Sequence, residues 1–443
     1  MNFFKLEENN TSLKQEFNAG LTTFLAMMYI VPVNMLIMGD AGMPKDALLT
    51  ATAVITIISC IFNGFWANTP VALSVGMGLN AYFTYGLVIG MKIPWQTALG
   101  VVCLSAIIFV LLSFTNFRIW IIKNIPIDLR RAISAGIGAF ICFIGLKQMG
   151  FIVDNPATLV SIGNVSDPKV FVGIIGLISI ISFWALKLKG GFILSVIVTS
   201  IFAWVFGIYD APKEFFSAPA SISPIFMQLD ILDALKLALI PAIITFFVTH
   251  LFDSVGTLTG VCNRANLFDE HNEEGTHKLA KNLESDAITS VAGSIVGTST
   301  ITAFAESASG VEAGGKTGLT AVFTGLLFIF TLFLLPLFSA IPANAIYPIL
   351  VMVGVLMFSE LGKVNYNDPA ICVSTFLTVL LMPLTYSITV GLSIGFISYF
   401  LVKLVLRKWK DINSGIITLT LISLLAFLVT SAPAFFGKLI GAN

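Results

Sequence analysis

Apolar stretches about as long as a membrane-crossing helix recur along this chain, and short polar breaks separate them. Such a helix needs roughly 17 to 25 mostly apolar residues. The composition agrees, because 57% of the 443 residues are hydrophobic, 11% are charged, and the mean hydropathy is +0.95. These values are typical of a chain whose solvent is the bilayer. The sequence therefore predicts an all-α polytopic membrane protein.

The chain is predicted to contain fourteen transmembrane elements. Full crossings are expected at 17–38, 46–66, 95–114, 128–149, 169–187, 191–208, 236–260, 317–338, 345–360, 369–383 and 386–405. Shorter elements rich in small residues are expected at 71–90, 284–298 and 302–312. A further apolar stretch, 414–434, has no place among the fourteen.

The positions of the basic residues predict the orientation. With the N-terminus in the cytoplasm, 17 of the 24 Lys and Arg residues fall in cytoplasmic loops, six fall on the opposite side, and Lys438 is unassigned. This excess follows the positive-inside rule. Residues 1–16 are polar and show no cleavable signal. We therefore expect a multi-pass protein of the bacterial cytoplasmic membrane, in contact with lipid, with a cytoplasmic N-terminus.

Seven elements precede residue 210 and seven follow residue 236, so the two halves have opposite orientations. An odd number of crossings in each half is what an inverted repeat requires. The predicted cytoplasmic N-terminus is 1–16, and the first repeat is 17–208. A connecting loop, 209–235, leads to the second repeat, 236–405, and a C-terminal segment, 406–443, follows.

The third and tenth elements are predicted to be half-helices preceded by extended backbone. Asn68-Thr69-Pro70 precedes the third element, and Gly297-Thr298-Ser299-Thr300 precedes the tenth. Extended backbone is tolerated at membrane depth only where protein or a water-filled cavity satisfies it. A pair of half-helices at equivalent points of two halves indicates a transporter's binding site. The alternative is that both are short tilted helices packed by small residues.

Asp253 and Glu306 lie inside apolar stretches, and they are the main candidates for chemistry. An ionised acid at the bilayer centre costs roughly 2.5 to 3.5 kcal/mol. A bound substrate or a transferred proton would offset that cost, so both acids are candidates for substrate binding and proton coupling. The structural alternative is a protonated acid that only bonds a neighbouring helix.

Three further polar residues are candidates with open alternatives. Asn80 either ties helices together or touches the ligand, because a buried amide needs partners for its donors and its acceptor. His250 lies one turn before Asp253 and either pairs with it or is a packing residue. Thr257 lies four residues after Asp253 and shares its helix face.

Other functions lack support in the sequence. Zero net charge without a basic face argues against a nucleic-acid partner. The five cysteines are dispersed singly, without metal-ligand or disulfide spacing, so no metal or cofactor is expected. Gly310 to Thr317 matches the phosphate-loop pattern, but it lies between a half-helix and an apolar span, where that pattern has no nucleotide-binding fold around it. An enzyme is not predicted.

Four motifs in order resemble the AzgA-like purine permeases, relatives of the nucleobase-ascorbate transporters, and the similarity runs from about residue 14 to 411. The motifs are FNAGLTTFLAM (17–27), GMGLNAYF (76–83), LFDSVGT (251–257), and GTST (297–300) followed by ESASG (306–310). The resemblance implies a core domain (17–114 and 236–338), a gate domain (128–208 and 345–405), an elevator-type motion and a homodimer formed through the gate domain.

The resemblance also implies the site residues. It places substrate binding on Asn80, Asp253 and Glu306, with Phe304 as a stacking neighbour. Met77 and Thr257 depart from residues found in uracil-transporting relatives. We expect N–H groups at Gly76 to Gly78 and at Phe304, Ala305 and Glu306 to complete the contacts.

The predicted function is import of purine nucleobases, such as adenine, guanine and hypoxanthine, by proton symport. One alternative is a sulfate or bicarbonate carrier of similar fold, although two acids at the site would repel an anion. A channel or a receptor is the other alternative.

Overall fold

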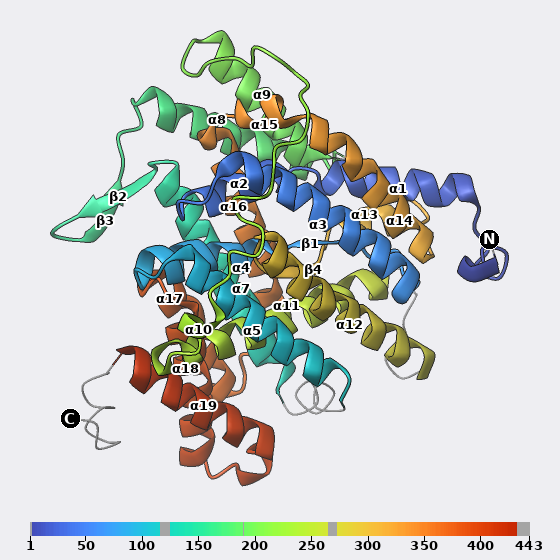
Figure 1. Ribbon diagram of the computed structural model, residues 1–443. Coiled ribbons are helices and arrows are strands. Elements are labelled where there is room, and N and C mark those ends of the chain that lie inside the picture. The colour runs from blue at the N-terminus through green and yellow to red at the C-terminus, as the bar shows by residue number, and fades with distance from the viewer. Residues whose placement is uncertain (1, 116–124, 189, 265–272, 432–443) are drawn as a thin grey trace.

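The computed structural model describes residues 2–115, 125–188, 190–264 and 273–431. The basic residues Arg118, Lys123 and Lys189, used above to predict the orientation, and the end of the C-terminal segment lie outside these ranges. Figure 1 shows a predominantly helical molecule with two short strand pairs.

The first half contains the long helices expected from its apolar stretches. They are α1 (Leu13–Met27), α2 (Ile30–Gly39), α3 (Lys45–Trp66), α5 (Trp95–Ser113), α7 (Ile127–Gln148), α8 (Pro168–Ala185) and α9 (Gly191–Val205). A hairpin of β2 (Ile152–Asn155) and β3 (Leu159–Ile162) projects from the helices between α7 and α8.

The second half begins after the connecting segment, which holds only the short helix α10 (Ile231–Ala234) and a 3-10 turn. Its longer helices are α11 (Ile240–Arg264), α12 (Glu273–Val296), α14 (Gly318–Phe328), α16 (Ala343–Phe358), α17 (Pro369–Leu384) and α18 (Ile388–Val405), with the short α15 (Leu335–Ser339) between α14 and α16. The unassigned apolar stretch forms α19 (Ser414–Ser431), which packs on α18.

Capping residues set several helix starts. A side-chain oxygen in each of these residues accepts a hydrogen bond from a first-turn N–H, which satisfies a backbone donor that has no partner within the helix. The capping residues are Ser12, Asp167, Thr317, Asp368 and Ser387.

Within the described residues, eight helices are long and apolar enough to cross a membrane. The shorter apolar helices α9, α14 and α17 add three elements, and α12 adds one. The two strand–helix units described next complete the fourteen predicted elements. The predicted fold class is therefore confirmed. One element was predicted wrongly in length: 284–298 was expected to be short, but α12 spans 24 residues, because its polar first half lies outside the apolar stretch.

The two predicted half-helices begin after short strands that pair with each other. The first strand–helix unit is β1 (Leu73–Val75) followed by α4 (Met77–Ala81) and a π-helix to Gly90. The second unit is β4 (Ile301–Ala303) followed by α13 (Ser307–Glu312). The strands are antiparallel, with Ser74 opposite Thr302, and they lie at the centre of Figure 1. Pairing satisfies the extended backbone inside the protein, as membrane depth requires.

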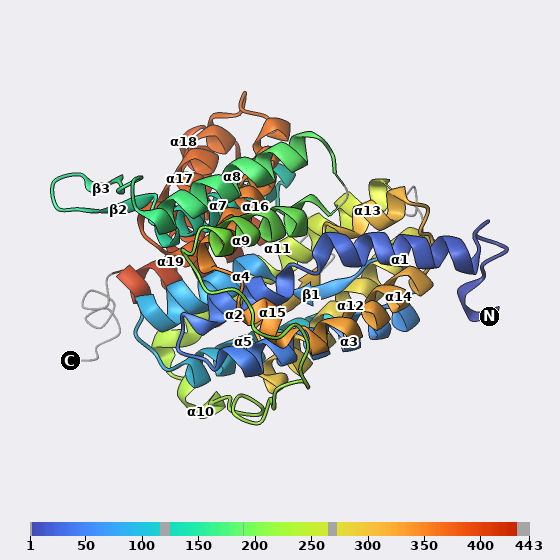
Figure 2. The ribbon, with the colours of Figure 1, turned by 90° about the horizontal axis from the view of Figure 1, so that it is seen from above.

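The helices form two groups, which Figure 2 shows from above. One group contains α1, α2, α3, α5, α12 and α14, and the other contains α7, α8, α9, α16, α17 and α18. Within the second group α7 and α16 approach each other very closely at Gly138 and Gly354. A Cβ atom added at Gly354 would lie 2.4 Å from the Gly138 carbonyl oxygen, so there is no room for a side chain there. The strand pair and α11 lie between the groups.

Candidate functional site

Asp253 and Glu306, the two acids of the candidate site, come from different helices. Asp253 is on α11, and Glu306 is the N-cap residue of α13. Both side chains are partly exposed, and so is Thr257, whereas Ala305 and Gly256 are fully in the exposed class. A Cβ atom added at Gly256 would find nothing within 4 Å. Both acids are therefore only partly covered by neighbouring residues.

Tyr29 is the hydrogen-bond partner of Glu306. It lies in the short break between α1 and α2, and its hydroxyl donates to Glu306 Oε1. The tyrosine is completely buried, and its ring packs edge-on against Phe192 of α9, with ring centroids 5.3 Å apart. Sequence reasoning missed Tyr29, because a single tyrosine in an apolar span carries no distinctive signal.

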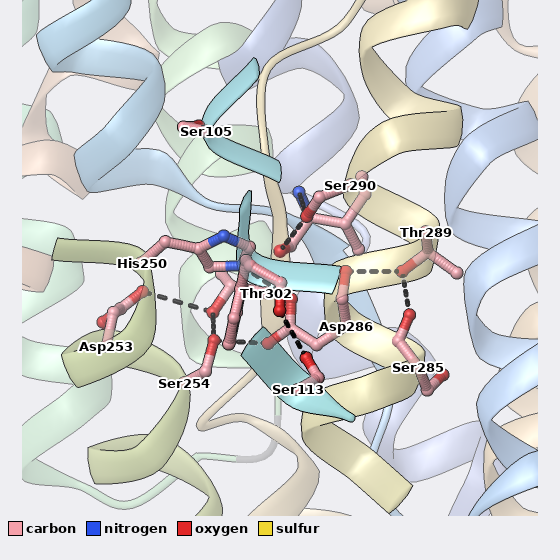
Figure 3. Close-up of polar contacts among 12 residues, drawn as sticks. Ser105, Ser113, His250, Asp253, Ser254, Ser285, Asp286, Thr289, Ser290 and Thr302 are labelled. Carbon is pink, nitrogen blue, oxygen red and sulfur yellow. Dashed lines mark hydrogen bonds and ion pairs between the residues drawn. The ribbon is translucent and has the colours of Figure 1, made fainter. Parts of the chain in front are cut away.

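Asp253 begins a line of polar side chains that runs into the protein (Figure 3). Thr302 Oγ1 of β4 donates to Asp253 Oδ2 at 3.3 Å, and it lies 3.1 Å from Ser254 Oγ. Ser254 in turn donates to Asp286 Oδ2 of α12. Oxygen atoms therefore connect the partly exposed acid Asp253 with the fully buried acid Asp286.

His250 contacts Asp286 rather than Asp253. His250 Nε2 lies 2.7 Å from Asp286 Oδ1, and the other ring nitrogen, Nδ1, has no partner among the described residues. Both side chains are fully buried. Asp286 was missed in the sequence analysis, because the residues before it are polar and it does not lie inside an apolar stretch as Asp253 does.

Asn80 differs from the two acids in its burial. It is completely buried, its Nδ2 donates to Asn34 Oδ1, and Asn34 Nδ2 donates to Thr52 Oγ1 at 2.7 Å. The Asn80 oxygen has no partner among the described residues. These contacts account for the amide nitrogen, which bonds Asn34 of α2, but not for the amide oxygen, so both alternatives stay open.

The remaining predicted site residues are placed as follows. Met77 and Phe304 are buried, at 9% and 4% exposure. The Gly76 N–H donates to Thr300 O at 2.9 Å and the Phe304 N–H donates to Ala72 O at 3.0 Å. The expectation that both groups are free for a ligand was wrong, because strand pairing uses them. A Cβ atom added at Gly78 would lie 2.9 Å from Ile137 on α7.

The segment that matches the phosphate-loop pattern binds a side chain of the protein itself. The buried Glu16 of α1 accepts from the N–H of Lys316 at 3.1 Å and from that of Thr317 at 3.4 Å, and Thr320 Oγ1 donates to it at 2.5 Å. A carboxylate thus takes the place at the start of α14 that a phosphate would need. This contact argues against nucleotide binding there. Among the described residues no group of three His, Cys, Asp or Glu could hold a metal ion.

The fold matches that of known membrane transporters. The transmembrane domain of the cyanobacterial bicarbonate transporter BicA aligns with a TM-score of 0.65 at 15% identity, covering 86% of this chain and 97% of that domain. The murine anion transporter Slc26a9 aligns with a TM-score of 0.62 at 12% identity, covering 87% of this chain and 68% of that one. These identities establish the fold alone, which is the inverted-repeat fold with core and gate domains. The class that this fold defines is that of multi-pass helical membrane proteins.

Sequence comparison gives the family. The model of the Permease family matches residues 14–394. Adenine permease AdeP of Escherichia coli (strain K12) is 42% identical over 429 residues, which cover 97% of this chain and 96% of that protein. Guanine/hypoxanthine permease PbuG of Bacillus subtilis (strain 168) is 37% identical over 437 residues, which cover 96% and 99%. The chain belongs to the permease family, and it is a transporter rather than an enzyme. The resemblance drawn from its motifs is confirmed.

Proposed function

We propose that this protein imports purine nucleobases across the bacterial cytoplasmic membrane by proton symport, with its N-terminus in the cytoplasm. The observation that carries the proposal is a pair of partly exposed acids, Asp253 and Glu306, beside the paired strands of a permease whose relatives are named for adenine, guanine and hypoxanthine. An ionisable residue inside a membrane-spanning segment is by default a functional-site hypothesis.

The chemistry of a carboxyl group suits both the base and the proton. A neutral purine offers ring N–H donors, ring nitrogen acceptors and an exocyclic group. A carboxylate accepts from an N–H, and a protonated carboxyl donates to a ring nitrogen or a carbonyl. Glu306 would contact the edge of the base. Asp253, connected through Thr302 and Ser254 to Asp286, would hold the site or carry the proton.

Proton coupling supplies the driving force for accumulation. Moving one proton with a neutral base transfers one charge, worth about 2.3 kcal/mol per 100 mV, or roughly fiftyfold accumulation. We infer that the helix group containing α7 and α16 is the gate domain and forms a homodimer. The group containing α1 and α3, together with the strand pair, would be the core that moves against it in an elevator motion.

Uptake by proteoliposomes tests the proposal. We expect labelled adenine, guanine or hypoxanthine to accumulate when an inward proton gradient is imposed, and a protonophore to abolish the accumulation. The structural neighbours favour one competitor, an anion carrier, because BicA is a bicarbonate transporter. Competition by sulfate or bicarbonate but not by purines would support the anion carrier. Ion currents too large for a carrier would support a channel, and binding without uptake would support a receptor.

A further inference from the structure

A cluster of three hydrogen-bonded side chains joins the two helix groups at one end of the molecule. It consists of Asp40, which ends α2, Tyr85 of the π-helix, and Gln148, the last residue of α7. Gln148 Nε2 donates to Asp40 Oδ2 at 3.1 Å and to the Tyr85 hydroxyl at 2.9 Å. The Tyr85 hydroxyl donates to Asp40 Oδ2 at 2.7 Å. Gln148 therefore bonds the second helix group both to the end of α2 and to the first strand–helix unit.

Every hydrogen-bonding position that the cluster uses is matched. A carboxylate oxygen accepts two hydrogen bonds, a hydroxyl donates one and accepts another, and an amide nitrogen donates two. The two hydrogens of Gln148 Nε2 thus reach Asp40 and Tyr85, and Asp40 Oδ2 accepts from both partners. Tyr85 is buried, whereas Asp40 and Gln148 are partly exposed. The cluster is complete without a ligand, and water is close enough to replace its bonds if the helices separate.

A second tyrosine attaches the same unit to the second helix group. Tyr82 lies three residues before Tyr85, and its hydroxyl is 2.6 Å from Thr389 Oγ1 in the first turn of α18. Both of these side chains are buried. Glu306, at the start of the second unit, bonds instead to Tyr29, between α1 and α2. The first unit is thus hydrogen-bonded to α7 and α18 of the second group, while the acid of the second unit is hydrogen-bonded within the first group.

Beside the cluster the two groups are not continuously packed. A cavity of about 570 Å³ lies between them and is lined by Met35 of α2, Lys45 at the start of α3 and Ala343 at the start of α16. This is the end of the molecule at which α2 reaches Asp40 and α7 reaches Gln148. The hydrogen bonds of Gln148 therefore bridge two groups that a cavity separates nearby.

We propose that Asp40, Tyr85 and Gln148 form a latch that is closed in this conformation and opens when the core moves against the gate, so that it sets the balance between the two facing states of the transporter. This inference rests on the proposed function, because it takes the second helix group to be the gate. In the predicted orientation α2 and α7 both end at the outer face, so the closed latch belongs to the inward-facing state. Bonds made in only one of two states shift the equilibrium toward that state.

The decisive variant is Gln148→Met, which keeps an unbranched side chain at the end of α7 but removes both donors. The hydrogen bond from Tyr85 to Asp40 remains, so both of these residues keep a partner. We expect the ratio of outward-facing to inward-facing protein to rise at least about fivefold, which corresponds to the loss of one or two hydrogen bonds.

A cysteine at Gly256 reports which side the site faces. Gly256 lies one turn after Asp253, is exposed, and has no atom within 4 Å of an added Cβ. A membrane-impermeant maleimide added to intact cells reacts with Gly256→Cys only when the site faces outward, so the labelling rate follows the population of that state. Labelling of the protein with its native cysteines alone is subtracted. Gln148→Met should raise the rate from outside at least about fivefold and should not raise the rate in inside-out vesicles.

Two further variants separate the latch from a general effect at the end of α7. Lys147→Met changes the neighbouring, exposed side chain, whose ion pair with Asp154 is 3.9 Å long, and it should leave external labelling within about twofold. Tyr85→Phe keeps the ring but removes the hydroxyl of the latch, and it should raise external labelling as Gln148→Met does. The double variant should rise less than the product of the two single changes, because both remove the bond between Gln148 and Tyr85.

Several outcomes would overturn the latch. They are an unchanged or lower rate of external labelling in Gln148→Met and Tyr85→Phe, and an equal rise in Lys147→Met. If one of the two latch variants does not reach the membrane, the other decides the matter. These outcomes leave the proposed function standing. A complete lack of external labelling in the unaltered protein and in both latch variants would contradict the proposed motion and the latch with it, and a lack of purine uptake by the unaltered protein would contradict the proposed substrate.

Discussion

The two strand–helix units occupy corresponding places in the two halves of the chain, yet their polar residues have different surroundings. In the first unit, Asn80 is sealed inside the protein and bonds to Asn34. In the second unit, Glu306 is partly exposed beside the exposed Ala305. The difference teaches that one repeated framework serves two purposes. The polar group of the first unit bonds a residue of a neighbouring helix, and that of the second unit is partly exposed.

The largest effect is expected from Glu306→Gln, which keeps the size of the side chain but removes its ability to ionise. Purine accumulation driven by a proton gradient should fall from roughly fiftyfold to none, with normal amounts of protein in the membrane. The matched control is Glu312→Gln, on the same short helix, which should accumulate purine normally. Undiminished accumulation by Glu306→Gln would remove Glu306 from the mechanism and end the contrast between the two units.

The next largest effect is expected from Asp286→Asn, behind the second unit. The substitution removes the carboxylate that contacts both His250 and Ser254 in a fully buried position. Asn has one acceptor oxygen where Asp has two, so a buried partner loses its acceptor at a cost of about 1 to 3 kcal/mol. The purified protein should therefore melt at lower temperature, and transport should fall about tenfold. Glu284→Gln, two residues earlier on α12, is the control. If Asp286→Asn melts at the same temperature as the unaltered protein, the buried contacts of Asp286 with His250 and Ser254 do not hold the second unit in place.

A smaller effect is expected from Asn34→Ala, which leaves the Asn80 amide without its partner in the first unit. An unsatisfied buried polar group costs about 1 to 3 kcal/mol, so stability should decrease by that amount. The KM for purine should change less than about threefold, because Asn80 is completely buried. A tenfold change in KM at unaltered stability would mean that Asn80 contacts substrate and that both units share one role.

The smallest effects are expected at two glycines, one beside each unit. Gly78→Ala brings a methyl group within 2.9 Å of Ile137 on α7, and it should lower the maximal uptake rate roughly two- to fivefold at constant KM, since α7 must shift slightly. The methyl group added by Gly256→Ala would have no atom within 4 Å, so this variant should stay within about twofold of the wild-type rate. Equal rates for the two variants in the same uptake assay would contradict a close contact between the first unit and α7 during transport.

Much of the fold could be predicted from the sequence because membrane-crossing helices have a strong and simple signal. The lengths of the apolar stretches predicted α3, α5, α7 and α18 to within a few residues. The extended backbone before each half-helix was predicted from Asn68-Thr69-Pro70 and from Gly297 to Thr300. The pairing of the two strands was not predicted, because three-residue strands carry too little pattern to identify a partner in the other half of the chain.

The candidate site was predictable only where a residue contrasted with its neighbours. Asp253 and Glu306 are acids within apolar sequence, so they were identified directly. Asp286 follows the polar first half of α12, and that setting concealed it. Tyr29 and Asn34 are uncharged, and nothing in the sequence distinguishes them from packing residues. Their importance comes from contacts with residues far away in the chain, which only the folded structure brings together.

The pairing of β1 with β4 has a consequence for biogenesis. The backbone partners of Leu73 to Val75 are supplied by residues Ile301 to Ala303, which leave the ribosome more than two hundred residues later. Until then the extended segment before α4 has unpaired peptide groups that lipid cannot satisfy. Insertion of the first half is therefore incomplete while the chain is still being synthesised, and this nascent segment must remain in the water-filled translocation machinery or at the membrane surface until its partner strand arrives.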